Sequence, residues 1–449
     1  MMTEKKEKRG EWSSTLGFIL AAAGSAVGLG NLWKFPYLAG KNGGGAYLFV
    51  YLIFVGLIGF TMILAEMAIG RNGHSDALGA FRKVSENWKY LGLLQIFISF
   101  LILSYYSVIG GWVLKYVFSF LSGGISGDKA TYFTNYISST NGPIIFHLFF
   151  MIATAAIVFK GVSSGIEKAS KFMMPALFGL LILICIRSVT LPGAGAGIEF
   201  FLKPDFSKLN GSVVLDALSQ VFYSLSLAMG ITVTYGSYLR KEDNLLGNAI
   251  KVPILDTIVA ILAGFAILPA VFALGFKPGA GPGLMFITLP AVFEQMAFGK
   301  LFGLMFFVLV LFAALTSSIS LLEVSTSLLV DQFKIKRQKA VIILTAALFL
   351  LGVPSSLSMG AWADLRIFFG MNFFDFLCYL TDNIFLPISG LLTCVFIGYV
   401  WKKEDLYKQI TNDGTIKFKM FKVWFGMLKY VAPIILVVIL LKSLGIINV

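Results

Sequence analysis

Long apolar segments separated by short polar joints run along almost the whole chain. Most of these segments reach about 20 residues, the length that an α-helix needs to cross the hydrocarbon core of a bilayer. The joints leave no room for a separate soluble domain, so we predict one all-α integral membrane domain over residues 1–449. We expect about eleven transmembrane helices. Their approximate cores are residues 13–38, 44–70, 91–121, 144–159, 169–187, 213–238, 252–275, 301–330, 340–357, 373–400 and 426–445.

The composition supports the membrane class. Hydrophobic residues make up 57% of the 449 residues and charged residues only 13%, whereas soluble domains are about 45–50% apolar. The first apolar segment, Ser13 to Leu38, is longer than the apolar core of a signal peptide, so we expect it to be retained. Three cysteines and two histidines are scattered without a spacing pattern. We therefore expect neither a disulfide framework nor a metal centre built from these residues.

The net charge of +13 is not spread evenly. Lysine and arginine gather in alternate joints, and such joints lie on the cytoplasmic side of membrane proteins. The distribution of basic residues therefore indicates how the chain is oriented in a lipid bilayer. We expect no nucleic-acid partner. Placing the N-terminus in the cytoplasm puts every basic joint inside. These joints lie at residues 5–9, 71–89, 160–171, 240–251, 334–339 and 402–422.

Two predicted spans are interrupted by small and polar residues. The first contains Gly24–Asn31, with the sequence GSAVGLGN, and the sixth contains Ser224–Gly230, with the sequence SLSLAMG. Non-helical backbone at membrane depth is tolerated where it is buried in protein or lines a wet cavity. Taken alone, the glycines are equally compatible with a small-residue face for close helix packing.

The two interruptions lie five spans apart, which favours a transporter built from two inverted repeats with the binding site between them. We predict a 5+5 inverted-repeat fold in which helices 1 and 6 are unwound at mid-membrane. The first repeat would cover residues 13–187, the inverted second repeat 213–400, and an accessory eleventh helix would lie within 401–449. Residues 281–297 are too short and interrupted to span, so we expect a re-entrant outer lid there.

The stretch Gly24 to Pro36, GSAVGLGNLWKFP, followed by Asn42 to Ala46, NGGGA, resembles the first-span signature of the neurotransmitter:sodium symporters. The resemblance continues through Tyr105-Tyr106, the sixth-span break and Leu315 to Ser318, and it covers essentially the whole chain. Within the family it is similar to the bacterial transporters of leucine, tyrosine and several hydrophobic amino acids. It implies symport of an amino acid with sodium by alternating access, in a bacterial inner (plasma) membrane.

The resemblance implies two sodium sites. Their ligands would be backbone carbonyl, hydroxyl and carboxylate oxygens, which suit a hard cation and still permit its release. On Thr316 and Ser317 the alternative is a hydroxyl that hydrogen-bonds a carbonyl or a neighbouring helix. The first site would use Ala26, Asn31, Ser224 and Asp256 with the substrate carboxylate, and the second would use Gly24, Val27, Ala313, Thr316 and Ser317.

The resemblance also implies a substrate pocket whose apolar members have ordinary helix packing as their alternative. The Tyr106 hydroxyl and the Leu29 and Gly30 backbone would bind the carboxylate. Gly28 replaces the aspartate by which monoamine members of the family bind an amine, which points to an amino acid. The full set is Ala26, Leu29, Gly30, Ile102, Tyr106, Tyr223, Ser224, Ser226, Met229, Ser317 and Leu321.

Two gates follow from the same resemblance. Arg9, Trp12 and Asp331 would close the cytoplasmic side through an ion pair. At the outer side Lys34 replaces the usual arginine and lacks its rigid bidentate fork. We expect its acidic partner to be Asp375, with Asp382 as the alternative.

Chloride dependence is predicted to be absent. In the family's chloride-dependent animal members, an asparagine occupies the position of Asp256 and a serine that of Ala260. A fixed carboxylate next to the first sodium would do the work of the anion. The alternative places Asp256 near the cytoplasmic interface beside Lys251, where it would reach water.

Two other classes of protein are weighed against transport. A channel would favour identical pore-lining segments around a symmetry axis, and the two halves differ. An enzyme would need a nucleophile–base pair or metal ligands at membrane depth, but Glu66, Asp256 and Glu323 lack a partner histidine or cysteine. We therefore predict no enzyme. Glu66 is either an interface residue of little consequence or a functional acid, and the oligomeric state stays open.

Overall fold

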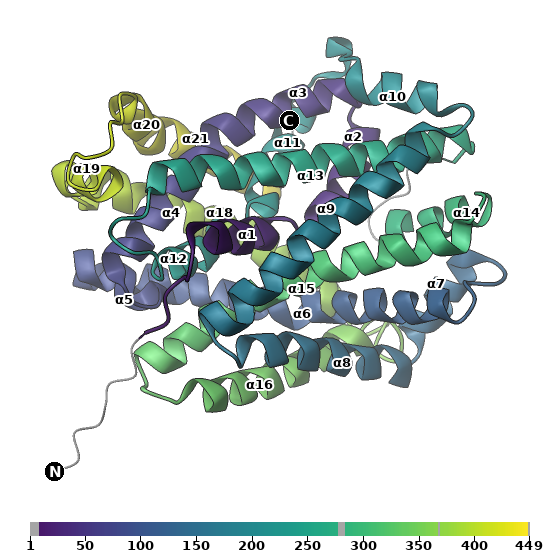
Figure 1. The fold of residues 1–449 in the computed structure, drawn as a ribbon, viewed down its shortest axis with the longest axis horizontal. Coiled ribbons are helices and arrows are strands. Elements are labelled where there is room, and N and C mark those ends of the chain that lie inside the picture. The colour runs from purple at the N-terminus through teal and green to yellow at the C-terminus, as the bar shows by residue number, and fades with distance from the viewer. Residues whose placement is uncertain (1–8, 277–282, 367–368, 448–449) are drawn as a thin grey trace.

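The computed structural model describes residues 9–276, 283–366 and 369–447. Within these ranges the regular secondary structure is helical, which confirms the all-α prediction. Figure 1 shows long helices running side by side along the longest axis of the molecule. They include α6 (Lys89–Leu121), α9 (Lys168–Val189), α13 (Leu245–Ala273) and α15 (Gly299–Asp331).

The described residues contain nine helical segments that are long and apolar enough to cross a membrane. A tenth span is the pair Thr15–Ala26 and Gly30–Lys41, which is bent by 52° at its break. The predicted sixth span is split more deeply, into α11 (Gly211–Ser224) and α12 (Ile231–Gly236). The nine segments are Gly45–Gly73, Glu86–Leu121, Asn141–Val158, Val162–Val189, Leu245–Ala273, Gly299–Asp331, Arg337–Leu357, Phe373–Val400 and Phe421–Ser443.

The first break follows α1 (Thr15–Ala26), because Val27 adopts extended backbone angles before the helix resumes in η1 (Gly30–Lys34) and α2 (Phe35–Lys41). In the second break Ser226, Ala228 and Gly230 all have positive φ, of 51°, 64° and 76°. A non-glycine residue in this region costs on the order of 1–3 kcal/mol. Tertiary contacts must therefore hold the broken segment in place.

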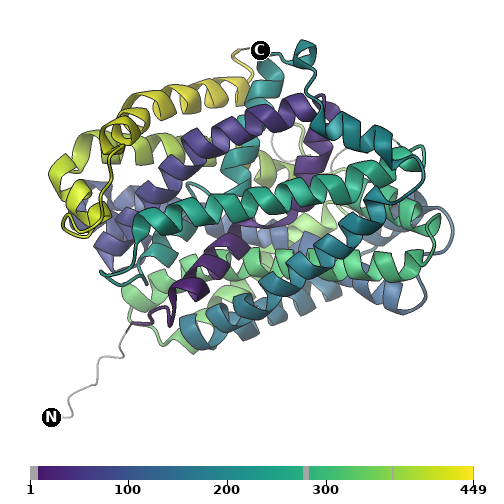
Figure 2. The ribbon, with the colours of Figure 1, turned by 45° about the horizontal axis from the view of Figure 1, so that its top comes forward.

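The two ends of the long axis carry different elements (Figures 1 and 2). One end carries the N-terminal segment, α5 (Ala77–Val84) and α19 (Lys403–Thr411), and it is called the N-terminal end below. The opposite end carries α7 (Lys129–Ser138), α10 (Ala194–Leu202) and α14 (Leu289–Glu294).

The predicted re-entrant lid is described from residue 283 onward. It forms η6 (Leu284–Thr288) and α14, an apolar stretch of Leu284–Glu294 that is too short to span. The Tyr116 hydroxyl donates to the Phe286 carbonyl at 2.9 Å, and the Phe133 and Phe286 rings stack with centroids 5.0 Å apart. The segment is therefore packed against α6 and α7 instead of crossing the bundle.

Candidate functional site

A cavity lies where the two helix breaks meet α6 and α15. It is built from all eleven residues expected for the substrate pocket, together with Ser25, Gly28 and Ile231. No charged side chain is among the described residues that line it. The predicted pocket residues that it brings together are Ala26, Leu29, Gly30, Ile102, Tyr106, Tyr223, Ser224, Ser226, Met229, Ser317 and Leu321.

The cavity has an apolar wall and a polar one. Ile102, Met229 and Leu321 are buried and supply the apolar wall. On the polar side, the buried Tyr106 hydroxyl faces the Ser317 side chain and the Leu29 backbone, and neither contact closes into a well-formed hydrogen bond. A buried hydroxyl without a partner costs free energy, so a ligand acceptor placed there would be stabilised.

Ser25, which was not predicted, joins the two breaks to α15. Its carbonyl accepts hydrogen bonds from the Ser226 and Ser317 hydroxyls, each at 3.1 Å. Its own hydroxyl lies 2.6 Å from the Ser320 hydroxyl. The sequence signal was only a small polar residue inside the first break. The geometry makes this residue the junction of three helices.

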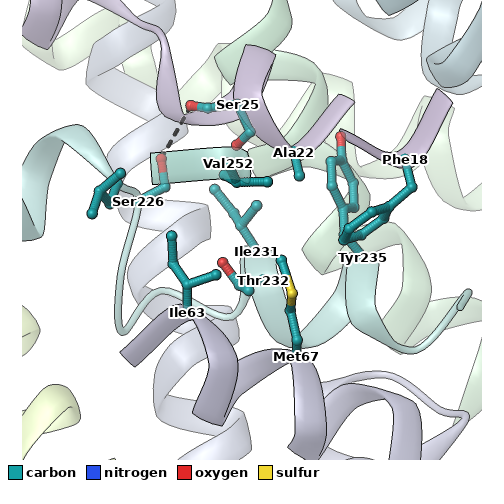
Figure 3. A pocket seen from close by; sticks show the side chains of 11 residues that line it. Phe18, Ala22, Ser25, Ile63, Met67, Ser226, Ile231, Thr232, Tyr235 and Val252 are labelled. Atoms are coloured by element: carbon teal, nitrogen blue, oxygen red, sulfur yellow. Dashed lines mark hydrogen bonds between the residues drawn. The ribbon is translucent and has the colours of Figure 1, made fainter. Parts of the chain in front are cut away.

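A second, smaller cavity adjoins the first on the side toward the N-terminal end. Figure 3 shows the Ser25–Ser226 hydrogen bond at one edge of it and the rings of Phe18 and Tyr235 at the other. The Tyr235 carbonyl accepts a hydrogen bond from the indole nitrogen of Trp12 at 3.0 Å. Trp12 thus binds the backbone of Tyr235, a residue that lines this second cavity.

The side chains expected at the first sodium site lie in direct contact. The Asn31 amide nitrogen donates to Ser224 Oγ at 3.0 Å and to Asp256 Oδ1 at 2.8 Å. The Ser224 hydroxyl donates to Asp256 Oδ2 at 2.8 Å, and the Tyr51 hydroxyl donates to the same oxygen at 3.3 Å. Asp256 is fully buried. The alternative that it reaches water beside Lys251 is therefore wrong.

The residues expected at the second sodium site lie between α1 and α15. A Cβ built on Gly24 would stand 3.3 Å from Thr316 Cβ, so the two helices touch at this point. The Thr316 hydroxyl donates to the Phe312 and Ala313 carbonyls at 3.0 Å each. Ala313 and Thr316 are thus adjacent, while the Ser317 hydroxyl turns toward Ser25 and the substrate cavity.

The three residues expected at the cytoplasmic gate meet at the N-terminal end. Arg9 forms an ion pair with Asp331 at 3.0 Å, and its guanidinium also donates to the Ser237 hydroxyl at 2.8 Å. The same guanidinium lies 4.7 Å from the centre of the Tyr238 ring. Trp12 is buried beside this pair. The ion pair therefore joins the segment before α1 to the end of α15.

At the opposite end, the structure places the two candidate partners of Lys34 differently. Asp375 is exposed and bonds with Asn372 at the start of α17 (Phe373–Cys378). Asp382 instead lines one cavity together with Lys34 and Tyr223. The Lys34 amine lies 4.1 Å from the centre of the Tyr223 ring, within cation–π range. The geometry favours the alternative, Asp382, over Asp375.

Glu66 is not an interface residue of little consequence. It is fully buried, and its carboxylate accepts the Ala228 N–H at 2.7 Å within the second break. The Ala228 carbonyl accepts from the Ser389 hydroxyl at 2.7 Å, and the Met229 carbonyl accepts from the Ser99 hydroxyl. Three helices thus hold the strained segment. Serines inside apolar spans gave no sequence signal specific enough to find this role.

Glu323, the third intramembrane acid, has a cationic partner. Its carboxylate is fully buried, pairs with both terminal nitrogens of Arg337 and accepts the Tyr238 hydroxyl at 2.6 Å. A buried carboxylate needs such partners to remain charged. This pair adds a second ionic contact near the C-terminus of α15, at the N-terminal end of the molecule.

Two broken helices around a buried cavity, with polar groups from both breaks converging at mid-span, define a secondary transporter of the multi-pass membrane class. Comparison with known proteins specifies the family. The model of the sodium:neurotransmitter symporter family matches residues 9–136 and 136–448. The chain belongs to this family and is a sodium-dependent symporter.

Three similar proteins illustrate the match. The crystal structure of MhsT in complex with L-phenylalanine superposes with a TM-score of 0.89 at 44% identity, over 97% of this chain and all of that one. The uncharacterized sodium-dependent transporter YhdH of Bacillus subtilis is 40% identical over 99% of both chains. The human sodium- and chloride-dependent GABA transporter 2 is 28% identical over 91% of this chain and 77% of its own.

Proposed function

We propose that this protein imports a neutral hydrophobic or aromatic L-amino acid together with sodium, independently of chloride. The observation that carries the substrate class is the cavity, whose described lining is apolar apart from hydroxyl and backbone groups. Without a charged side chain, the site offers no countercharge to a cationic or anionic substrate side chain. The likeness to MhsT, whose structure contains L-phenylalanine, agrees with this choice.

The substrate carboxylate would bind at the first break. The Tyr106 hydroxyl and the N–H groups of Leu29 and Gly30 supply donors on that side of the cavity. Gly28 keeps the space open, because a Cβ there would lie 2.7 Å from Ser317 Oγ. An aspartate at this position would place a second negative charge beside the carboxylate. The glycine therefore suits a substrate that brings its own carboxylate.

Two sodium ions would accompany the amino acid. The first would lie among the carbonyl of Ala26 and the side chains of Asn31, Ser224 and Asp256, with the substrate carboxylate completing its shell. The second would lie between α1 and α15, on the carbonyls of Gly24, Val27 and Ala313 and the hydroxyls of Thr316 and Ser317. Carboxylate, carbonyl and hydroxyl oxygens are the donors that a hard cation prefers.

Chloride independence rests on Asp256. Its carboxylate is buried among Asn31, Ser224 and Tyr51, and no cationic side chain is among its hydrogen-bond partners in the described part of the chain. A buried carboxylate without a counterion is costly, and sodium at the first site would balance it. Ala260, one turn further along α13, is also buried and offers no hydroxyl to an anion.

In the cycle we propose, the N-terminus lies in the cytoplasm of a bacterial cell, and the chain spans the inner membrane. The halves 13–187 and 213–400 rock around the cavity, while Arg9, Trp12 and Asp331 close the inner side. Lys34 and Asp382 would close the outer side. Alternating access of this kind keeps the site from opening to both sides together.

The test is uptake into proteoliposomes with an inward sodium gradient. Unlabelled leucine, tyrosine and tryptophan should each compete with labelled phenylalanine, whereas lysine and glutamate should not. Gluconate in place of chloride should leave uptake unchanged, and Asp256→Asn with Ala260→Ser should make it chloride-sensitive. Transport of lysine or glutamate alone would refute the substrate class. A wild type that stops without chloride would refute the role of Asp256.

A further inference from the structure

Two lysines near the cytoplasmic loop between the last two spans lie over the same aromatic ring. Lys403 begins α19, and its amine is 5.3 Å from the centre of the Phe425 ring. Lys429 lies in the final span, and its amine is 6.0 Å from that ring and 4.5 Å from the Tyr399 ring. The exposed ring of Tyr430 flanks the same amine at 5.7 Å. Two cations therefore converge on one aromatic cluster.

Among the described residues, neither lysine has an anionic partner. Elsewhere at this end, Lys171 pairs with Glu167 and Lys241 pairs with Asp413. In the part of the chain that the structure describes, the amines of Lys403 and Lys429 form neither an ion pair nor a hydrogen bond with a carboxylate. Cation–π contacts offset only part of the cost of taking an ammonium out of water. The donors of both amines stay free for an anion.

The depth of Lys429 is fixed by its neighbour in the preceding span. The Tyr399 hydroxyl donates to the Lys429 carbonyl at 3.3 Å, and a Cβ on Gly398 would lie 3.2 Å from Lys429 Cα. These two residues come at the end of the span Phe373–Val400, where the chain leaves the apolar layer for α19. Lys429 thus lies at the level where interfacial tyrosines and snorkelling lysines meet lipid headgroups.

We propose that Lys403 and Lys429 form a binding site for the phosphate of an anionic phospholipid, with its acyl chains against the exposed face of the final span. Tyr399, Val423, Tyr430 and Ile434 expose apolar surface there. Basic pockets between spans on the cytoplasmic side bind anionic headgroups. Lys403 begins α19, which lies at the N-terminal end of the molecule (Figure 1).

The experiment titrates phosphatidylglycerol, with phosphatidylcholine in parallel, into the detergent-purified full chain and counts bound lipid by native mass spectrometry. The wild type should retain phosphatidylglycerol in preference to phosphatidylcholine. Lys403→Gln with Lys429→Gln should weaken phosphatidylglycerol binding about tenfold. Lys403→Arg with Lys429→Arg should keep it, which shows that the cluster folds with altered side chains.

The matched control is Lys336→Gln with Lys339→Gln, which removes two exposed lysines at the start of α16 (Arg337–Leu357). Neither amine makes a cation–π contact with an aromatic ring of the described residues. This control should leave phosphatidylglycerol binding unchanged. The proposal would be overturned if the control variant lost as much phosphatidylglycerol binding as Lys403→Gln with Lys429→Gln, because general charge attraction would then explain the binding. Competition by inorganic phosphate as strong as by phosphatidylglycerol would overturn it as well, because the site would then recognise a free anion.

Discussion

The two ends of the substrate cavity are closed in different ways. Toward the N-terminal end, the barrier combines the Arg9–Asp331 ion pair, the buried indole of Trp12 and its hydrogen bond to Tyr235. Toward the opposite end, Tyr223 lines both the substrate cavity and the cavity that contains Lys34 and Asp382. The Lys34 amine lies over the Tyr223 ring, and no carboxylate of the described residues is within ion-pair distance of it. The N-terminal side is closed by an ion pair and hydrogen bonds, while the opposite side is covered by the Tyr223 ring.

This difference is what alternating access requires. A transporter that opened both ends with equal ease would leak, so the closed end must be held by contacts that the other end lacks. The same two helices, α1 and α15, meet at Gly24 and Thr316, and the proposed gate lies where α1 begins and α15 ends. An ion between these helices would therefore favour closure of the N-terminal end.

The largest effect is expected from the contact between α1 and α15. Thr316→Val with Ser317→Ala replaces two hydroxyls by apolar groups at a site proposed to hold a cation, so sodium-driven uptake should fall to background. The control is Thr326→Val on the same helix, whose hydroxyl bonds the Leu322 carbonyl and no other group of the described residues. It should transport normally. Full uptake by the double variant would show that Thr316 and Ser317 do not bind a sodium ion that transport requires.

A smaller loss is expected at the ion pair. Arg9 and Asp331 are partly buried, with 23% and 16% of their side chains exposed, so breaking the pair should cost about 1–3 kcal/mol of closure. Arg9→Ala should lower uptake roughly tenfold, and Arg9→Lys should recover part of it, as measured by initial rates at equal expression. If Arg9→Ala transports like the wild type, the closure at this end does not depend on the pair.

The two candidate acids at the opposite end can be compared directly. Asp382→Asn should lower uptake several-fold, because Asp382 lines the cavity that contains Lys34. Asp375→Asn should change little, since that exposed side chain only accepts a hydrogen bond from the Asn372 side chain, which caps the helix start. Initial uptake rates of both variants, measured side by side, show which of the two acids acts with Lys34. The reverse order would restore Asp375 as the partner of Lys34.

The smallest effect is expected at Lys34 itself. Lys34→Arg keeps the cation over the Tyr223 ring and should transport within about twofold of the wild type, whereas Lys34→Ala should lose about threefold to fivefold. Kinetics of phenylalanine uptake would separate the two variants. Equal uptake rates for Lys34→Arg and Lys34→Ala would show that the charge of Lys34 has no role in transport.

The sequence predicted the broken helices and the cavity because each break is marked locally, by glycines and serines where lipid-facing helices carry branched apolar residues. The resemblance then predicted which residues line the cavity, and all eleven do. The partner of Lys34 was harder to predict. A π-helical segment, Tyr379–Phe385, lies between Asp375 and the rest of its span, and the extra residue per turn shifts the face on which Asp382 falls.

The role of Glu66 was hidden for a different reason. Its partner is a backbone N–H 162 residues away, in a segment whose conformation is left-handed at Ala228. No residue type marks such a donor in the sequence. Side chains that bind unwound backbone are therefore found only when the path of the chain is known.

The most direct test of the account is concentrative uptake of labelled phenylalanine by the purified protein in liposomes. With sodium outside and potassium inside, the account predicts accumulation above the external concentration, collapse of that accumulation when an ionophore equalises sodium, and faster exchange when unlabelled phenylalanine is loaded inside. Uptake that merely reaches the external concentration, whatever the sodium gradient, and that does not respond to internal substrate would contradict sodium-coupled alternating access and indicate a passive pore.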